Sequence, residues 1–159
     1  MSLDRATIEA ADSQGMLGDV LAMPLQLGDA LWRAQSADIR PVDSPAGLVV
    51  CGMGGSAIGG DLALAALGDR ATRPIYVVRG YAIESWTPPE TLVLCSSYSG
   101  ETEEVLACFD AAGAAGARRV VLTTGGSLAE AARAEGVPVI GAGAKIDPDV
   151  TVEAAERVP

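Results

Sequence analysis

The chain has 159 residues, of which 49% are apolar, and 21 acidic against 11 basic residues give it a formal charge of −10 at pH 7. This size suits one compact domain, and the negative charge disfavours nucleic acid and anionic membranes as partners. The sequence contains no histidine, which excludes a Ser-His-Asp triad, a histidine metal site and a histidine acid or base. No stretch has the order of a signal peptide or the length of a membrane span, so we expect a cytoplasmic protein.

The first part of the chain predicts helices. Residues 4 to 36 carry apolar side chains such as Ile8, Leu17 and Leu31 at helical spacing, interrupted by Pro24. Proline is favoured in the first turn of a helix, which predicts two helices with Pro24 opening the second. We expect residues 1–36 to form an N-terminal helical segment.

From Gly47 the pattern changes to short apolar runs separated by segments of helix length. Such runs are continuous rather than alternating, which indicates a parallel sheet covered by helices on both faces. This α/β domain is predicted to span residues 37–143, followed by a polar tail at residues 144–159. The five predicted strands are residues 47–53, 74–80, 91–97, 118–125 and 137–142.

Three segments between these runs predict helices. Residues 57–69 form a candidate weakened by two glycines, and residues 101–117 place apolar side chains along one stripe. Ser127 and Glu130 have the spacing of a capping box that opens a third helix. We expect Cys51, Cys95 and Cys108 to be reduced core residues, because three cysteines cannot all pair and two lie in apolar runs.

Two loops rich in glycine and serine follow the first and third predicted strands. The amides at a helix N-terminus carry partial positive charge, glycine lets an anion approach the backbone, and hydroxyls add donors. Both loops match this description of an oxyanion site. The candidate binding residues are Gly54, Gly55 and Ser56 in the first loop and Ser97, Ser99 and Thr102 in the second.

The two loops meet if the strand order is 2-1-3-4-5, the order of flavodoxin-like folds. The order then reverses between strands one and three, and ligands of open α/β sheets bind at that crevice. A phosphate monoester would sit among the hydroxyls, with the glycine turn facing the rest of the ligand. We expect no metal and no cofactor at this site.

Two alternatives compete with this interpretation. The spacing of Gly52, Gly54 and Ala57 fits a dinucleotide fingerprint, and Arg79 could accept a 2′-phosphate of NADP. Alternatively, serines at these places cap helices and bind nothing.

The carboxylates near the loops weaken rather than support a site. Glu101, Glu103 and Glu104 oppose an anion at short range, unless they complement the helix dipole from solvent. Asp61 and Glu84 are placed where a general base could stand, although each also fits a solvated surface position.

The assembled motifs resemble a SIS (sugar isomerase) domain, and more narrowly the N-terminal SIS domain of the bifunctional phosphoglucose/phosphomannose isomerase family. The resemblance rests on "GMGGSAIGGDL" (52–62) and "SYSGETEE" (97–104), supported by "TTGGSLAE" (123–130), "VPVI" (137–140), "DSQGML" (12–17) and "MPLQL" (23–27). It covers roughly residues 10 to 142. Glu101 stands where many relatives have asparagine, and the family's Q-P-R segment is missing after residue 142.

The resemblance implies contacts to the sugar from Gly54, Gly55 and Ser56, and to the phosphate from Ser97, Ser99 and Thr102. It implies an intramolecular oxidoreductase that interconverts glucose 6-phosphate or mannose 6-phosphate with fructose 6-phosphate through a cis-enediol. The family's catalytic glutamate and histidine belong to a second SIS domain, so we expect this chain to be catalytically incomplete. It also implies a hexose 6-phosphate ligand and a homodimer. The alternatives are a non-catalytic sugar-phosphate sensor or an NADP-binding Rossmann domain.

Overall fold

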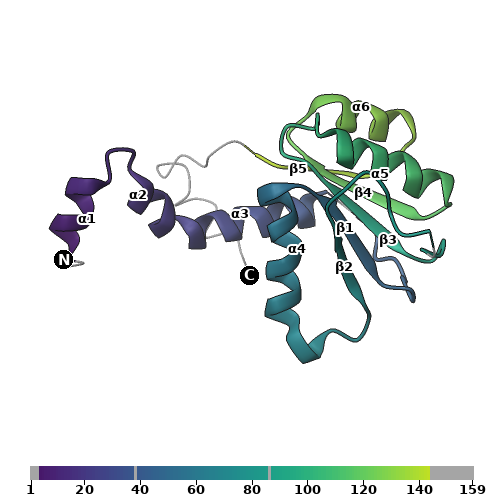
Figure 1. Cartoon of the computed structure of the whole chain (residues 1–159), viewed down its shortest axis with the longest axis horizontal. Helices are drawn as coiled ribbons and strands as arrows, with labels where there is room; N and C mark the ends of the chain where they lie inside the picture. The colour runs from purple at the N-terminus through teal and green to yellow at the C-terminus, as the bar shows by residue number, and fades with distance from the viewer. Residues whose placement is uncertain (1–3, 38, 86, 144–159) are drawn as a thin grey trace. The chain divides into compact units, whose positions relative to one another are not determined.

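The computed structural model describes residues 4–37, 39–85 and 87–143. Five parallel strands form one sheet in the order β2-β1-β3-β4-β5, so the predicted fold class and strand order are confirmed (Figure 1). Each predicted apolar run contains one of these strands. Their bounds are β1 Leu48–Gly52, β2 Ile75–Val78, β3 Leu92–Ser96, β4 Arg118–Thr123 and β5 Val139–Gly141.

Helices cover both faces of the sheet. The helix α4 (Gly54–Leu67), followed by the short 3-10 helix η1 (Gly68–Arg70), packs against β1 and β2. On the other face, α5 (Glu103–Ala114) packs against β1, β3 and β4, and α6 (Gly126–Ala134) against β4 and β5 (Figure 1). The α5 and α6 face holds the buried core, because both helices turn an apolar stripe towards the sheet.

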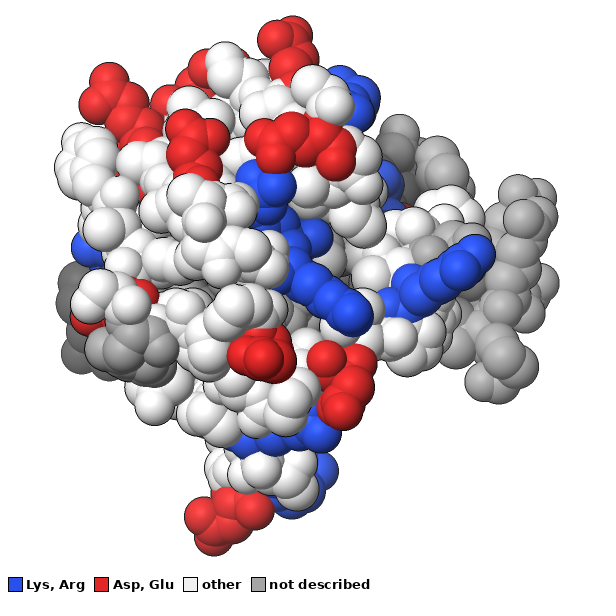
Figure 2. Space-filling model, turned by 90° about the vertical axis from the view of Figure 1, so that its right-hand side faces the viewer, with Lys and Arg blue, Asp and Glu red and all other residues white. Residues whose placement is uncertain are grey.

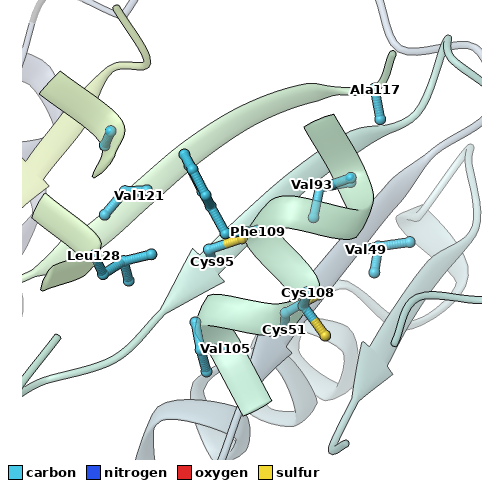
Figure 3. Close-up of a cluster of buried hydrophobic side chains, with 12 residues drawn as sticks. Val49, Cys51, Val93, Cys95, Val105, Cys108, Phe109, Ala117, Val121 and Leu128 are labelled. Carbon is cyan, nitrogen blue, oxygen red and sulfur yellow. The ribbon is translucent and has the colours of Figure 1, made fainter. Parts of the chain in front are cut away.

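The core includes Phe109 and all three cysteines, which are free thiols as predicted (Figure 3). The Cys108 thiol lowers the pKa of Cys51, but the Cys95 thiol and burial raise it, so that the pKa of Cys51 stands at about 12. The Cys51 thiol and burial also raise the pKa of Cys108. These two thiols therefore stay protonated at neutral pH and are poor nucleophiles.

The N-terminal segment forms three helices where the sequence predicts two: α1 (Arg5–Ala11), α2 (Met16–Leu21) and α3 (Met23–Ser36). The extra break arises at Asp12, whose carboxylate accepts hydrogen bonds from the amides of Met16 and Leu17 at 2.7 Å each. This side chain caps α2 and ends α1. Pro24 does lie in the first turn of α3, as predicted.

Residues Ala34–Gly143 form one compact unit that contains the sheet, and residues 4–33 belong to a second unit. The predicted domain boundaries remain a prediction, and the tail at 144–159 lies outside the described residues. No helix in the described part of the chain is long and apolar enough to cross a membrane.

Candidate functional site

The first predicted loop lies where β1 gives way to α4. Met53 is extended and precedes the helix without a side-chain cap, and among the first amides of α4 the Ser56 amide donates to the Met53 carbonyl at 3.1 Å. Gly54 and Gly55 are exposed and Ser56 is half-buried. The helix begins at Gly54, three residues before its predicted start at residue 57, and its N-terminal end has no side-chain cap that would compete with an anion.

The second loop holds its hydroxyls in a network. The Ser97 hydroxyl is buried, lies 2.7 Å from the Thr102 hydroxyl and accepts a hydrogen bond from the Gly100 amide at 3.0 Å. The exposed Ser99 hydroxyl accepts one from the Glu101 amide at 3.2 Å. The Ser97–Thr102 pair needs only one of its two hydroxyl hydrogens, and Ser99 acts here as an acceptor. Two hydroxyl hydrogens thus remain to be donated to a ligand.

The register of the sheet brings the two loops to one level. Gly52 at the end of β1 lies opposite Ser96 at the end of β3. The loops that follow border one cavity of about 480 Å³ at the carboxyl ends of the strands. Its lining residues are Met53, Gly55, Ser56, Gly59, Ser96, Tyr98, Leu122 and Ala142.

The cavity contains only part of the predicted set. Gly55 and Ser56 line it, whereas Ser97, Ser99 and Thr102 belong to the loop that continues from its β3 wall. Ser96 and Tyr98 are lining residues that the sequence-based prediction missed. Alternate residues of an extended chain face the same side, so Ser96 and Tyr98 face the side opposite to Ser97, a difference that serine content alone does not reveal.

The loop after β4 supports the loop after β3. The Tyr98 carbonyl accepts hydrogen bonds from the amide and the hydroxyl of Thr124, at 3.0 and 2.7 Å, and the Gly100 carbonyl accepts one from the Leu128 amide at 3.0 Å. Gly100 has a φ of +75°, and a Cβ there would overlap the Gly125 carbonyl oxygen. The loop after β4 thus fixes the loop after β3, through close contacts that only glycine permits.

Glu101 caps α6 in place of the predicted capping box, which is wrong. The helix begins at Gly126 without a side-chain cap from its own segment, and the Ser127 amide and hydroxyl donate to the Glu101 carboxylate at 2.7 and 2.8 Å. These hydrogen bonds, from the hydroxyl first and then the amide, hold the pKa of Glu101 below its ordinary value. The negative charge of the Glu101 carboxylate therefore stabilises the positive N-terminal end of α6.

The features that suggested a dinucleotide have local explanations. Arg79 forms an ion pair with Asp61 on the surface, which gives both side chains a structural partner. A Cβ on Gly52 would lie 3.0 Å from the Ala57 amide nitrogen, so close packing of β1 against α4 accounts for the glycine. Glu84 is exposed. Among the described residues, no cluster of His, Cys, Asp or Glu could hold a metal ion.

Arginine side chains gather at the other edge of the sheet, where the strands begin. Figure 2 views the molecule from that side and shows a short basic band with acidic side chains above and below it. A second cavity of about 500 Å³ lies there, lined by apolar residues together with Arg40, Arg118 and Arg119. Arg119 is engaged by the Phe109 carbonyl and the Glu135 carboxylate. Neither glycine/serine loop contributes to this cavity.

No family model matches the chain, but comparisons with individual proteins find relatives. The bifunctional phosphoglucose/phosphomannose isomerase of Caldicellulosiruptor bescii is 44% identical over 93 residues, which are 58% of this chain and 27% of that protein. The Aquifex aeolicus protein of the same name is 38% identical over 109 residues, 68% of this chain and 33% of the relative. The chain thus spans a third or less of these curated relatives.

Solved structures share the fold at low identity. An E. coli CFT073 protein has a TM-score of 0.51 and 20% identity, covering 81% of this chain and 75% of its own. The Vibrio vulnificus NanR protein complexed with ManNAc-6P has a TM-score of 0.53 and 19% identity, covering 92% and 59%. Tagatose-6-phosphate ketose/aldose isomerase from E. coli has a TM-score of 0.50 and 17% identity, covering 77% and 34%. The predicted resemblance is confirmed: over the matched residues the chain is a homologue of the bifunctional phosphoglucose/phosphomannose isomerases and has the SIS fold.

Proposed function

We propose that this chain is the sugar-phosphate-binding SIS domain of an isomerase that interconverts glucose 6-phosphate or mannose 6-phosphate with fructose 6-phosphate. The observation that carries the proposal is the cavity bordered by the loops after β1 and β3, the two neighbouring strands between which the sheet order reverses. Homology to named isomerases supports the substrate class. A sugar phosphate, ManNAc-6P, accompanies one of the structural neighbours.

The phosphate would bind without a basic side chain. It carries nearly two negative charges at neutral pH, and α5 begins after Thr102 without a side-chain cap, so its positive N-terminal end has no side-chain oxygen from Thr102. The Ser99 hydroxyl and the Ser97–Thr102 pair would donate hydrogen bonds to its oxygens. The sugar would extend towards Gly55 and Ser56.

The same geometry supports binding without turnover. Isomerisation moves a proton between C1 and C2, which needs a positioned base. The sequence has no histidine, and none of the described residues that line the cavity is an Asp or a Glu. We infer that the base is supplied from outside this chain. A non-catalytic sugar-phosphate sensor would use the same half-site.

We also propose a cytoplasmic homodimer. The exposed apolar side chains of α4 support an association surface, since Ile58 and Leu62 are 51% and 64% exposed.

Titration calorimetry with fructose 6-phosphate tests the proposed ligand class. We expect saturable binding of one hexose phosphate per chain, weaker or no binding of NADPH, and no turnover in a coupled assay. Saturable NADPH binding without hexose phosphate binding would replace this proposal by the dinucleotide alternative. Turnover at an ordinary enzymatic rate would contradict the inferred need for an external base.

A further inference from the structure

Tyr98 combines a fixed backbone with a free side chain. Its carbonyl oxygen accepts two hydrogen bonds from Thr124, which tie this residue to the loop after β4. Its side chain lines the cavity and the residue is 63% exposed. Within the described part of the chain, the Tyr98 hydroxyl makes no hydrogen bond. A large amphipathic ring is therefore held at the site by its backbone alone.

The rest of the cavity lining consists of small residues and of three apolar side chains, Met53, Leu122 and Ala142. The α4 wall consists of Gly55, Ser56 and Gly59, two of which have no side chain, and the β3 wall adds the small Ser96. Tyr98 is the one aromatic residue among the described residues that line the cavity. Phosphate donors in the neighbouring loop would grip a free phosphate as well as a phosphate ester. Selectivity for the sugar ester over free phosphate therefore comes from contacts beyond the phosphate, and a flat aromatic ring can supply such contacts at the carbon atoms of the sugar.

We propose that Tyr98 is a specificity-determining residue whose ring packs against the C–H groups of the bound sugar phosphate. This inference rests on the proposed function, because it assigns the sugar part of the same ligand. The faces of an aromatic ring carry partial negative charge and attract the weakly positive C–H hydrogens of a sugar. The ring also removes apolar carbon surface from water, whereas the hydroxyls of the sugar stay free to face Ser56 and solvent.

Calorimetric titrations of the 159-residue chain with fructose 6-phosphate and with inorganic phosphate test this role. We expect Tyr98→Ala to weaken fructose 6-phosphate binding up to about tenfold, because tenfold corresponds to about 1.4 kcal/mol, the upper end of what an aromatic contact contributes. The affinity for inorganic phosphate should change by less than about twofold, which a calorimetric titration can distinguish from a tenfold change. Tyr98→Phe should resemble the unmodified chain with both ligands, since the ring and not the hydroxyl makes the contact.

Tyr76→Ala is the matched control, because it removes the same side chain from β2 outside the cavity. It should leave both affinities unchanged. Tyr98→Leu supplies a second truncation of the flat ring should Tyr98→Ala fail to fold, with the same selective loss expected. If the unmodified chain and Tyr98→Ala bind fructose 6-phosphate equally, the inference is overturned while the proposed function stands. An equal loss for both ligands would also overturn it, since the side chain would then only position the loop. If the unmodified chain binds neither ligand, the proposed function fails and this role with it.

Discussion

Replacing Gly100 by alanine should lower the free energy of unfolding by about 2 to 5 kcal/mol, the sum of a left-handed conformation and overpacking. Gly100 has a φ of +75°, and a Cβ there would overlap the Gly125 carbonyl oxygen and lie 2.9 Å from the Thr123 hydroxyl oxygen. Both neighbours are fixed, because the Thr123 hydroxyl donates to the Gly125 carbonyl at 2.9 Å. The loop can accept the methyl group only by moving, which would also displace the hydroxyl network. Urea unfolding measures the loss of stability.

Gly136→Ala is the matched control for this prediction. Gly136 has a similar φ of +67°, but no atom lies within 4 Å of the position that its Cβ would take. The Gly136→Ala variant should therefore lose only the part of the free energy of unfolding that comes from the left-handed conformation, about 1 to 2 kcal/mol. Equal losses for the two variants would show that the contact between the loops after β3 and β4 is loose, which contradicts the supported-loop geometry.

The double change Ser97→Ala and Ser99→Ala should weaken hexose 6-phosphate binding by at least about 100-fold. Each hydrogen bond to a charged phosphate contributes on the order of 1.5 to 3 kcal/mol, and two of them account for this factor. Ser99 would donate directly, while Ser97 orients the Thr102 hydroxyl through their 2.7 Å contact. Titration calorimetry with glucose 6-phosphate measures the loss.

Ser99→Ala alone keeps this prediction testable if the double variant is unstable. Removing the Ser97 hydroxyl leaves the buried Gly100 amide without its partner, which costs stability, whereas Ser99 is exposed. We expect the single variant to fold normally and bind about tenfold more weakly, the loss of one such bond. Ser44→Ala, which lies before β1 at the opposite edge of the sheet, should bind normally. Undiminished binding by Ser99→Ala and by the double variant would remove the hydroxyls from the site.

The sheet could be predicted because its information is local. Each strand is a continuous apolar run, and the glycine/serine loops mark where the first and third runs end. The cap of α6 could not be predicted in the same way. A capping box is recognised from residues three apart, whereas the oxygen that caps α6 comes from Glu101, 26 residues before Ser127. The break between α1 and α2 was not predicted, because the apolar spacing continues across it while the Asp12 side chain caps α2.

The candidate site could also be predicted only in its local features. Serine and glycine content identified both loops, because anion binding by amides needs those residue types. It did not distinguish which serine faces the cavity, since Ser96 and Ser97 differ only in the direction that the strand gives them. The support from Thr124 depends on a contact between segments that are distant in sequence.

A crystal structure of the chain with fructose 6-phosphate is the most direct measurement of the central claim. We expect the phosphate oxygens to accept hydrogen bonds from the Ser99 and Thr102 hydroxyls and the sugar to lie along Gly55 and Ser56. A hexose phosphate bound instead between Arg40 and Arg118, at the edge where the strands begin, would contradict the account.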